Sequence, residues 1–364
     1  MHISELETPA LLIDLERMER NLCRAAHYAK EHDLRLRPHT KTHKIPAIGN
    51  KQIELGAVGL TVAKVGEAEV MVASGTPDLL VAYPVVGLKK LGRLMEVARK
   101  TSVTVALDSM QAARQLSDAA RAARVTIGVL VEADLGMNRC GVPVGEPLVD
   151  LARSVSRLPH LTLEGVAFYP GHIRSALDEN ERLLDQLAAD VARIVEDFRA
   201  ADLPLKVFSA GSTPLLFESH RFPGINEIRP GTYVFNDINC VRAGEAALDD
   251  CAVSIMTTVV SNARPGTIII DGGSKTFSSD RLAGTNESSY GYIVEAPEAV
   301  IYGQSEEHGH VDVRKCSRDF QVGDRLRVVP NHVCVCMNLH EQVYGIRGEQ
   351  VEQVWRVEGR GKLQ

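Results

Sequence analysis

This chain of 364 residues lacks the features that mark a membrane-bound or nucleic-acid-binding protein. It has no run of about eighteen apolar residues, the length that a membrane-spanning helix requires. Acidic residues outnumber basic ones by 47 to 41, so no excess of positive charge is present to attract a phosphate backbone. Its first residues lack the basic and then apolar pattern of a secretory signal. We therefore expect a cytoplasmic protein that binds neither a membrane nor nucleic acid.

The cysteines do not form a disulfide framework. There are seven of them, an odd number, scattered between Cys23 and Cys336, and this usage fits reduced thiols in a cytoplasm. The chain has no repeat of fixed period and no low-complexity linker. A G-x-G-x-x-G motif after the first strand is also missing, which argues against a doubly wound dinucleotide-binding fold.

Short apolar strands alternate with amphipathic helices from residue 34 onward. The predicted strands span residues 34–38, 57–63, 78–85, 103–109, 126–134, 161–170, 205–212 and 226–234. Helical spacing of leucines and other apolar residues is clear in 88–101 and 179–202. Such alternation is typical of a parallel sheet that is covered on both faces. Eight units favour a closed (β/α)8 barrel over an open doubly wound sheet.

The character of the sequence changes near residue 240, after which the pattern predicts strands separated by turns and no convincing helix. The predicted strands are 252–261, 266–271, 290–294, 299–304, 309–313, 324–330, 332–338, 342–346 and 351–358. We expect a barrel domain over 15–240 and a second, all-β domain over 241–364. An early strand over 10–14 precedes the barrel count, and we assign residues 1–14 to the β domain.

Lys41 is the first candidate for chemistry. It lies in the segment 37–44, R-P-H-T-K-T-H-K, at the end of the first barrel strand. Barrel enzymes build their sites at the carboxyl ends of their strands. Cationic neighbours in this segment favour the neutral amine that a lysine needs to bond covalently to a carbonyl compound. A solvated basic loop is the alternative for this segment taken alone.

Two turns near the end of the barrel are suited to phosphate. Gly211-Ser212-Thr213 follows one strand, and a helix is expected to begin near Pro214 with Thr213 as its cap. Free N–H groups at a helix start bind anions. The segment 229–233, R-P-G-T-Y, follows the last strand and adds Gly231 and Tyr233. Barrel phosphate sites often use the loops after strands seven and eight, where these turns fall.

Further polar groups follow other strands, and a ligand pair occurs late in the chain. Arg139 lies in D-L-G-M-N-R-C-G, and the segment 169–172, Y-P-G-H, offers Tyr169 and His172. On a strand over 332–338, His332 and Cys334 would share a face. Imidazole with thiolate favours Zn²⁺, and two protein ligands leave positions for water or substrate. Buried thiols on a strand are common, so this pair is a weak signal alone.

In this order, the motifs resemble those of the fold-type III pyridoxal-phosphate (PLP) enzymes. Among these enzymes, the chain is similar to the group of D-threonine aldolase and D-serine dehydratase, which is related to alanine racemase. The resemblance runs along essentially the whole chain. Its anchors are R-P-H-T-K-T-H-K, D-x-G-x-x-R-C-G, G-S-T, R-P-G-T-Y, E-H-G at 307–309 and P-N-H-V-C at 330–334. It implies a TIM-type barrel that binds PLP, a β domain with the metal ligands, and a homodimer.

The resemblance also implies a role for each candidate residue. Lys41 would bind the cofactor covalently, Arg139 would face its phenolic oxygen, and Tyr169 would lie beside its ring. The phosphate would contact Gly211, Ser212, Thr213, Gly231 and Tyr233. His332 and Cys334 would hold a divalent metal, Zn²⁺ or Mn²⁺.

Two departures leave the reaction open. Aldolases of the group commonly show His-x-Asp at the metal, whereas His332-x-Cys334 is similar to the dehydratases. Aldolases also place a histidine where this chain has Ser175, which leaves His172 as the candidate general base. We favour a D-threonine aldolase-like lyase that cleaves D-β-hydroxy-α-amino acids to glycine and an aldehyde. A D-serine or D-3-hydroxyaspartate dehydratase is the first alternative, and a racemase or non-catalytic PLP carrier is the second.

Overall fold

The computed structural model describes residues 1–174, 180–282 and 289–364. The chain divides into two compact units. The barrel unit comprises Cys23–Lys41, Ile45–Gly231 and Gly361–Gln364, and the β unit comprises Met1–Leu22, Thr42–Lys44 and Thr232–Arg360. Within the described ranges, none of the helices combines the length and apolar character needed to cross a membrane.

Eight parallel strands form the sheet of the barrel unit in the order β2-β10-β9-β8-β6-β5-β4-β3. They are β2 (Arg35–Leu36), β3 (Leu60–Val62), β4 (Asp78–Val81), β5 (Ser102–Leu107), β6 (Ile127–Asp134), β8 (Leu161–Ala167), β9 (Val207–Ala210) and β10 (Glu227–Ile228), with the short β7 (Val142–Pro143) beside β6. Each of the eight predicted barrel strands is confirmed.

Backbone hydrogen bonds join the two ends of this row of strands. Val58 N donates to Leu36 O at 2.9 Å, and Thr61 N donates to Pro38 O at 2.8 Å. Thr40 N in turn donates to Thr61 O at 2.8 Å. The segment that follows β2 is therefore bonded to β3, and the parallel sheet curls round as the barrel prediction required.

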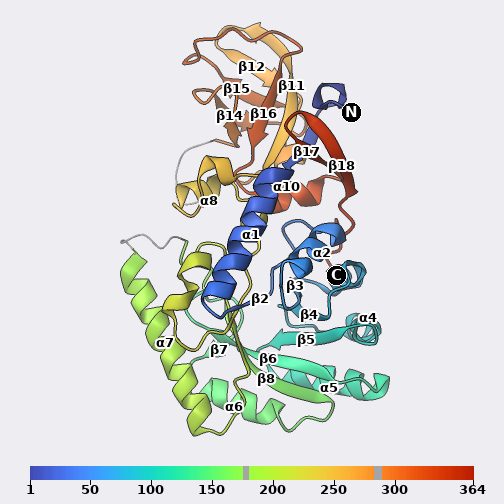
Figure 1. Cartoon of the computed structure of the whole chain (residues 1–364), viewed down its shortest axis with the longest axis vertical. Coiled ribbons are helices and arrows are strands. Elements are labelled where there is room, and N and C mark those ends of the chain that lie inside the picture. The colour runs from blue at the N-terminus through green and yellow to red at the C-terminus, as the bar shows by residue number, and fades with distance from the viewer. Residues whose placement is uncertain (175–179, 283–288) are drawn as a thin grey trace. The chain divides into compact units, whose positions relative to one another are not determined.

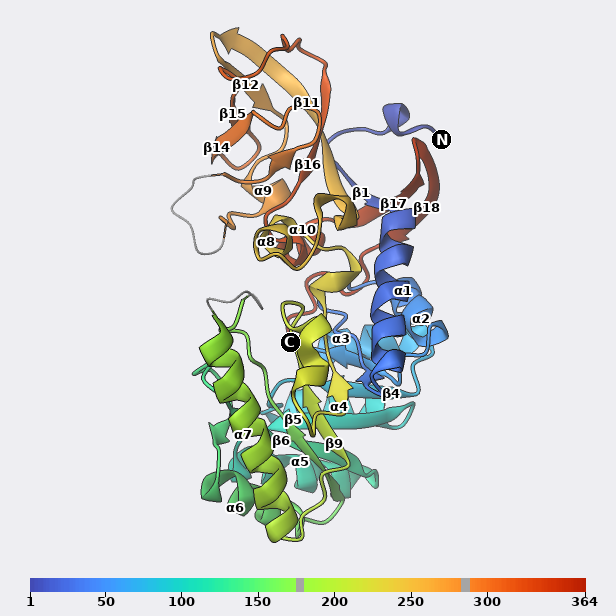
Figure 2. The ribbon, with the colours of Figure 1, turned by 60° about the vertical axis from the view of Figure 1, so that its left-hand side comes forward.

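Helices cover the outside of the strands. They are α2 (Pro46–Glu54), α3 (Val65–Met71), α4 (Leu88–Ala98), α5 (Met110–Ala123), α6 (Glu146–Val155) and α7 (Glu181–Ala200), as Figures 1 and 2 show. The buried residues of α7 recur every three or four positions, from Leu184 to Phe198, so one stripe of the helix packs inward. Helix α1 (Leu15–Glu31) begins in the β unit and ends in the barrel unit.

The β unit contains a mixed sheet in the order β14-β15-β12-β11-β1-β17-β18, with β13 and β16 joined through β11. Strand β1 (Ala10–Asp14) runs antiparallel to β11 (Val253–Arg264) and parallel to β17 (Gln342–Arg347), which confirms that the early strand pairs with the C-terminal part of the chain. The remaining strands are β12 (Thr267–Ile270), β13 (Tyr292–Ile293), β14 (Val300–Gln304), β15 (Gly309–Asp312), β16 (Arg325–Val329) and β18 (Gln350–Arg356).

Short helices interrupt this mostly-β unit, and here the sequence prediction was wrong. Residues 332–338 were expected to form a strand, but Val333–Leu339 form helix α10. Because apolar residues fill every position from Val333 to Met337, alternation could not be told from helical spacing; Val333, Cys336 and Met337 are the ones buried. Helices α8 (Ile238–Arg242) and α9 (Ser274–Phe277) were not predicted either.

Candidate active site

Three predicted cofactor residues meet at the carboxyl ends of the barrel strands. Lys41 follows β2, Arg139 follows β6, and Tyr169 follows β8. The Nζ of Lys41 lies 5.8 Å from the centroid of the Tyr169 ring, and the guanidinium carbon of Arg139 lies 4.7 Å from it. Two cations therefore flank one aromatic ring on the face where barrel enzymes hold their ligands.

The backbone around Lys41 is held by its own segment. Lys41 N lies 3.3 Å from Nδ1 of His39, to which it donates, and Thr40 donates through both its N–H and its hydroxyl to Thr61 O. Arg37, one of the cationic neighbours expected to act on the lysine, is buried in salt bridges with Glu227 and Asp78. Its charge is balanced by these two carboxylates, and the effect of the neighbouring cations on Lys41 stays a prediction.

The predicted phosphate turns lie side by side. Ala210 and Ile228 are partners in the parallel pair β9–β10, and Arg229 N donates to Ala210 O at 2.9 Å. Gly211 has φ +118°, a backbone conformation that favours glycine. A Cβ at this position would come within 3.1 Å of Arg229 N, so a side chain would fill the space beside the turn. The buried Oγ of Ser212 has no hydrogen-bond partner within the described residues. An open glycine turn beside a free hydroxyl fits the phosphate of PLP.

The helix expected at Pro214 does not form. A 3₁₀ helix over Leu216–Arg221 follows instead, and Leu216 N donates to Thr213 O at 3.0 Å. Any anion-binding N–H groups here therefore belong to an irregular turn rather than to the first turn of an α-helix. Gly231 ends the main segment of the barrel unit, and Tyr233 is buried in a 3₁₀ helix, Thr232–Val234, of the β unit.

A buried polar network lies among the barrel strands, and the sequence analysis missed it. Arg229 donates to Ser209 Oγ at 2.5 Å and to Phe168 O at 2.8 Å, and Ser209 donates to Glu227 at 2.6 Å. Arg229 therefore fixes the backbone next to Tyr169, although it was expected only to start a phosphate turn. Burial opposes ionisation of Glu227, but Arg37 and the hydrogen bond from Ser209 hold the pKa of this carboxyl below its usual value. Charged residues within strands are the signal that could have revealed this network.

His172, the candidate general base, stands against the turn that precedes Arg139. Its Nε2 lies 3.1 Å from the position that a Cβ on Gly136 would take. Its Nδ1 is buried, and no described residue bonds to it. The ring borders a pocket that Asp134 and α7 also line. Ser175, the position where the related aldolases place a histidine, lies outside the described residues.

The predicted metal ligands, His332 and Cys334, lie at the start of α10. His332 is the N-cap residue, and its Nδ1 lies 3.3 Å from Oδ2 of Asp237. The Sγ of Cys334 lies 3.2 Å from the hydroxyl of Thr42 and 3.7 Å from that of Thr232. Burial would lower the pKa of His332, but the Cys334 thiolate and the Asp237 carboxylate raise it to about 11. A hydrogen bond between the side chains of Cys334 and His332 is one of these causes, so the two groups lie within reach of each other.

This pair fits a metal with open coordination positions. Nitrogen and thiolate ligands are those that Zn²⁺ prefers. Across the described ranges, no three His, Cys, Asp or Glu residues are grouped so that they could hold a metal ion. An ion held by His332 and Cys334 would take its remaining ligands from water or substrate.

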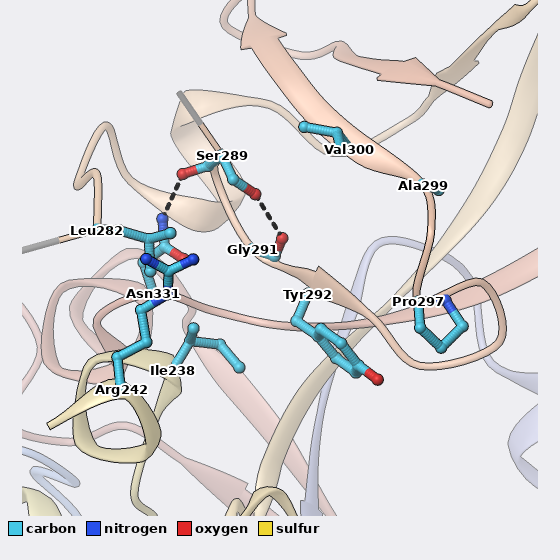
Figure 3. A pocket seen from close by; sticks show the side chains of 10 residues that line it. All are labelled: Ile238, Arg242, Leu282, Ser289, Gly291, Tyr292, Pro297, Ala299, Val300 and Asn331. Carbon is cyan, nitrogen blue, oxygen red and sulfur yellow. Dashed lines mark hydrogen bonds between the residues drawn. The ribbon is translucent and has the colours of Figure 1, made fainter. Parts of the chain in front are cut away.

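A pocket of about 600 Å³ in the β unit is lined by residues that are neighbours of His332 and Asp237 in the sequence (Figure 3). Ile238, which follows Asp237, and Asn331, which precedes His332, both line it, together with Arg242. Asn331 donates to Ser289 O at 2.6 Å, the bond drawn in Figure 3. The polar lining residues Asn331 and Arg242 were not predicted from the sequence, and neither was the position of Asp237.

The fold-type III class of PLP enzymes is defined by a curled β/α barrel followed in the chain by a mostly-β unit. The barrel presents a lysine, an arginine and a glycine-serine turn at the carboxyl ends of its strands. Residues 13–238 match the family described as alanine racemase, N-terminal domain, and residues 252–346 match the putative serine dehydratase domain. The chain belongs to this class, in the group of D-threonine aldolase and D-serine dehydratase, and is a PLP-dependent lyase.

Relatives of both reaction types resemble the chain over its whole length. It is 34% identical to 3-hydroxy-D-aspartate aldolase of Paracoccus denitrificans, covering 100% of this chain and 94% of that protein. The crystal structure of D-threonine aldolase from Filomicrobium marinum superposes with a TM-score of 0.93 at 33% identity, covering 99% and 98% of the two chains. D-threo-3-hydroxyaspartate dehydratase from Delftia sp. HT23 superposes with a TM-score of 0.89 at 30% identity, covering 98% of each.

Proposed function

We propose that this protein is a PLP- and divalent-metal-dependent aldolase that cleaves D-β-hydroxy-α-amino acids to glycine and an aldehyde. The observation that carries the proposal is the pair of His332 and Cys334, which lie two positions apart at the start of α10. In the same chain, Lys41 and Arg139 both lie near the ring of Tyr169. A racemase has no use for such a pair, and a PLP carrier needs neither the pair nor a second unit. The aldolases among the relatives support the choice of reaction.

Each barrel residue has a defined part in this reaction. PLP, when bound, supplies an electron sink for the bond that breaks at Cα. Lys41 binds the cofactor covalently and exchanges a proton with Cα through Nζ. Arg139 provides a positive charge for the phenolic oxygen of the cofactor, and Tyr169 packs beside its ring. The Gly211 turn and the buried hydroxyl of Ser212 bind the phosphate, with Thr213, Gly231 and Tyr233 as further contacts.

The metal ligands and the base act on the β-hydroxyl. His332 and Cys334 hold Zn²⁺ or Mn²⁺, which supplies a Lewis acid for that hydroxyl. His172, whose buried Nδ1 lacks a partner among the described residues, takes the hydroxyl proton. Loss of this proton drives the cleavage between Cα and Cβ.

A dehydratase reaction is the second candidate, and the identity of one ligand favours it. Solved structures of D-threo-3-hydroxyaspartate dehydratase include variants in which a histidine and a cysteine two positions later are replaced by alanine, and the cysteine variant is in a metal-free form. Cys334 has the same spacing from His332. In this alternative Lys41 removes the Cα proton, hydroxide leaves from Cβ, and the products are a 2-oxo acid and ammonia.

Product analysis separates the two reactions. The purified protein is incubated with D-threonine, PLP and Zn²⁺ or Mn²⁺, and the products are identified by mass spectrometry. Glycine with acetaldehyde supports the aldolase, whereas 2-oxobutyrate with ammonia assigns the dehydratase. If D-threonine, D-serine and 3-hydroxyaspartate all remain unchanged, the lyase proposal is wrong for these substrates.

The setting of the enzyme is also part of the proposal. We infer a cytoplasmic homodimer: all seven cysteines are free thiols, which suits a reducing compartment, and the dimer follows from the family resemblance. Light scattering coupled to size-exclusion chromatography tests the dimer, for which a monomeric mass would be the contrary result.

A further inference from the structure

Asp237 is a buried carboxylate shared by two short helices of the β unit. Its Oδ1 accepts a hydrogen bond from Cys240 N at 3.1 Å and so caps α8. Its Oδ2 accepts from Val333 N, the first residue of α10, at 3.1 Å. The side chain is 1% exposed, and both oxygens are occupied by backbone donors. Its position is therefore set by two helix starts, leaving it little freedom to rotate.

The same carboxylate reaches the imidazole of His332. Oδ2 lies 3.3 Å from Nδ1 of that ring. A carboxylate only accepts hydrogen bonds, so Nδ1 must carry the hydrogen. The lone pair of a neutral His332 then resides on Nε2, the nitrogen that a metal would bind.

We infer that Asp237 is the positioning residue of the metal pair: it fixes the Nδ1–H tautomer of His332 and anchors the start of α10, which carries Cys334. This inference rests on the proposed metal-dependent function. Carboxylates that orient a ligating histidine generally affect metal affinity by about 10- to 100-fold. We expect Asp237→Asn, which cannot accept from both Val333 N–H and Nδ1–H in the same way, to lose affinity within that range.

Metal affinity is the readout that loss of a helix cap away from the metal pair would not change. Zn²⁺ affinity is measured by competition with a chelating dye on the PLP-loaded, metal-stripped enzyme. The control is Ser109→Ala, which removes the N-cap of α5, where Ser109 Oγ accepts from Ala112 N at 3.3 Å in the barrel unit. Weaker Zn²⁺ binding in Asp237→Asn, with unchanged binding in Ser109→Ala, supports the inference. Equal affinity of Asp237→Asn and the parent enzyme overturns it.

A second measurement needs no variant at position 237. Long-range ¹H–¹⁵N correlation of the Zn²⁺-loaded enzyme, with His332→Ala used to assign the ring, reports which nitrogen bears hydrogen. Hydrogen on Nδ1 supports the inference, and a metal-bound Nδ1 overturns it. An enzyme that binds no Zn²⁺ overturns both the inference and the proposed metal site. An enzyme that binds Zn²⁺ through His332 but forms no lyase product overturns only the proposed reaction.

Discussion

The Sγ of Cys334 lies 3.2 Å from the hydroxyl of Thr42, the residue that follows Lys41 in the chain. Thr42 is fully buried and Cys334 is partly buried, so the contact is only partly accessible to water. A hydroxyl that donates to sulfur stabilises the thiolate, which is the form of cysteine that binds metals. One peptide bond therefore connects the residue that supports the proposed metal ligand with the lysine proposed to bind PLP.

Replacing Thr42 by valine tests this support. Thr42→Val keeps the volume but removes the donor, and we expect Zn²⁺ affinity to fall about tenfold, corresponding to the ~1.5 kcal/mol of a hydrogen bond to a charged group. Thr232→Val is the matched control, because its hydroxyl lies farther from the sulfur, at 3.7 Å, and should matter less. Equal effects of the two variants would show that the shorter contact has no special role.

Much of the barrel could be predicted from sequence because its signals are local. Parallel strands that are buried on both faces appear as short apolar runs, and residues 127–131 of β6 form such a run. The turn Gly211-Ser212-Thr213 was recognised from its position after a strand, and the structure places it beside the end of β10.

The features that were missed depend on partners far apart in the chain. Asp237 and His332 are separated by 95 positions, and neither residue type reveals the other. Arg229 was interpreted as part of a turn because its acceptors, Ser209 and Phe168, are known only once the barrel is formed. Helix α10 escaped prediction because its apolar run fits a strand as well as a helix, and because Asp237, which accepts from Val333 N, is far away in the chain.

Lys41 is proposed to be the residue that bonds to PLP. We expect Lys41→Ala to lack the visible absorption of the lysine-bound cofactor and to lose at least about 10³-fold of its activity, as removal of a group at the reacting centre generally does. Absorption spectra and initial rates check this. Lys44→Ala is the control, since Lys44 Nζ lies 3.4 Å from Gly359 O in the β unit, and it should retain the band. A band that persists without Lys41 contradicts the assignment.

The hydroxyl of Ser212, which has no hydrogen-bond partner among the described residues, is proposed to bind the cofactor phosphate. Ser212→Ala should raise the dissociation constant of PLP about tenfold, the equivalent of ~1.5 kcal/mol for a hydrogen bond to an anion. Fluorescence titration of the apoenzyme with PLP measures the effect. Ser219→Ala serves for comparison, because its hydroxyl already donates to Leu215 O at 2.8 Å in the following 3₁₀ helix. An unchanged dissociation constant in Ser212→Ala would place the phosphate elsewhere.

Glu245 should make stability depend on pH. Burial and the charge of Asp237 raise its pKa from 4.5 to about 8, so the folded protein retains a proton that the unfolded chain releases. Stability is therefore lost as the pH rises from about 4.5 to 8. Glu245→Gln should be more stable than the parent by about 3 kcal/mol at pH 9 and by little at pH 5. Thermal midpoints at both values check this, with the exposed Glu31→Gln as control; a parallel pH dependence of all three proteins would contradict it.

Metal titration during turnover tests the central claim most directly. The PLP-loaded enzyme is stripped of metal by a chelator, and acetaldehyde formation from D-threonine is followed while Zn²⁺ or Mn²⁺ is added to the parent enzyme and to Cys334→Ala. The account predicts a negligible rate before metal is added, a rise that saturates near one equivalent in the parent enzyme, and no such saturation in Cys334→Ala. Full activity in the stripped enzyme, or 2-oxobutyrate and ammonia in place of acetaldehyde, would contradict a metal-dependent aldolase.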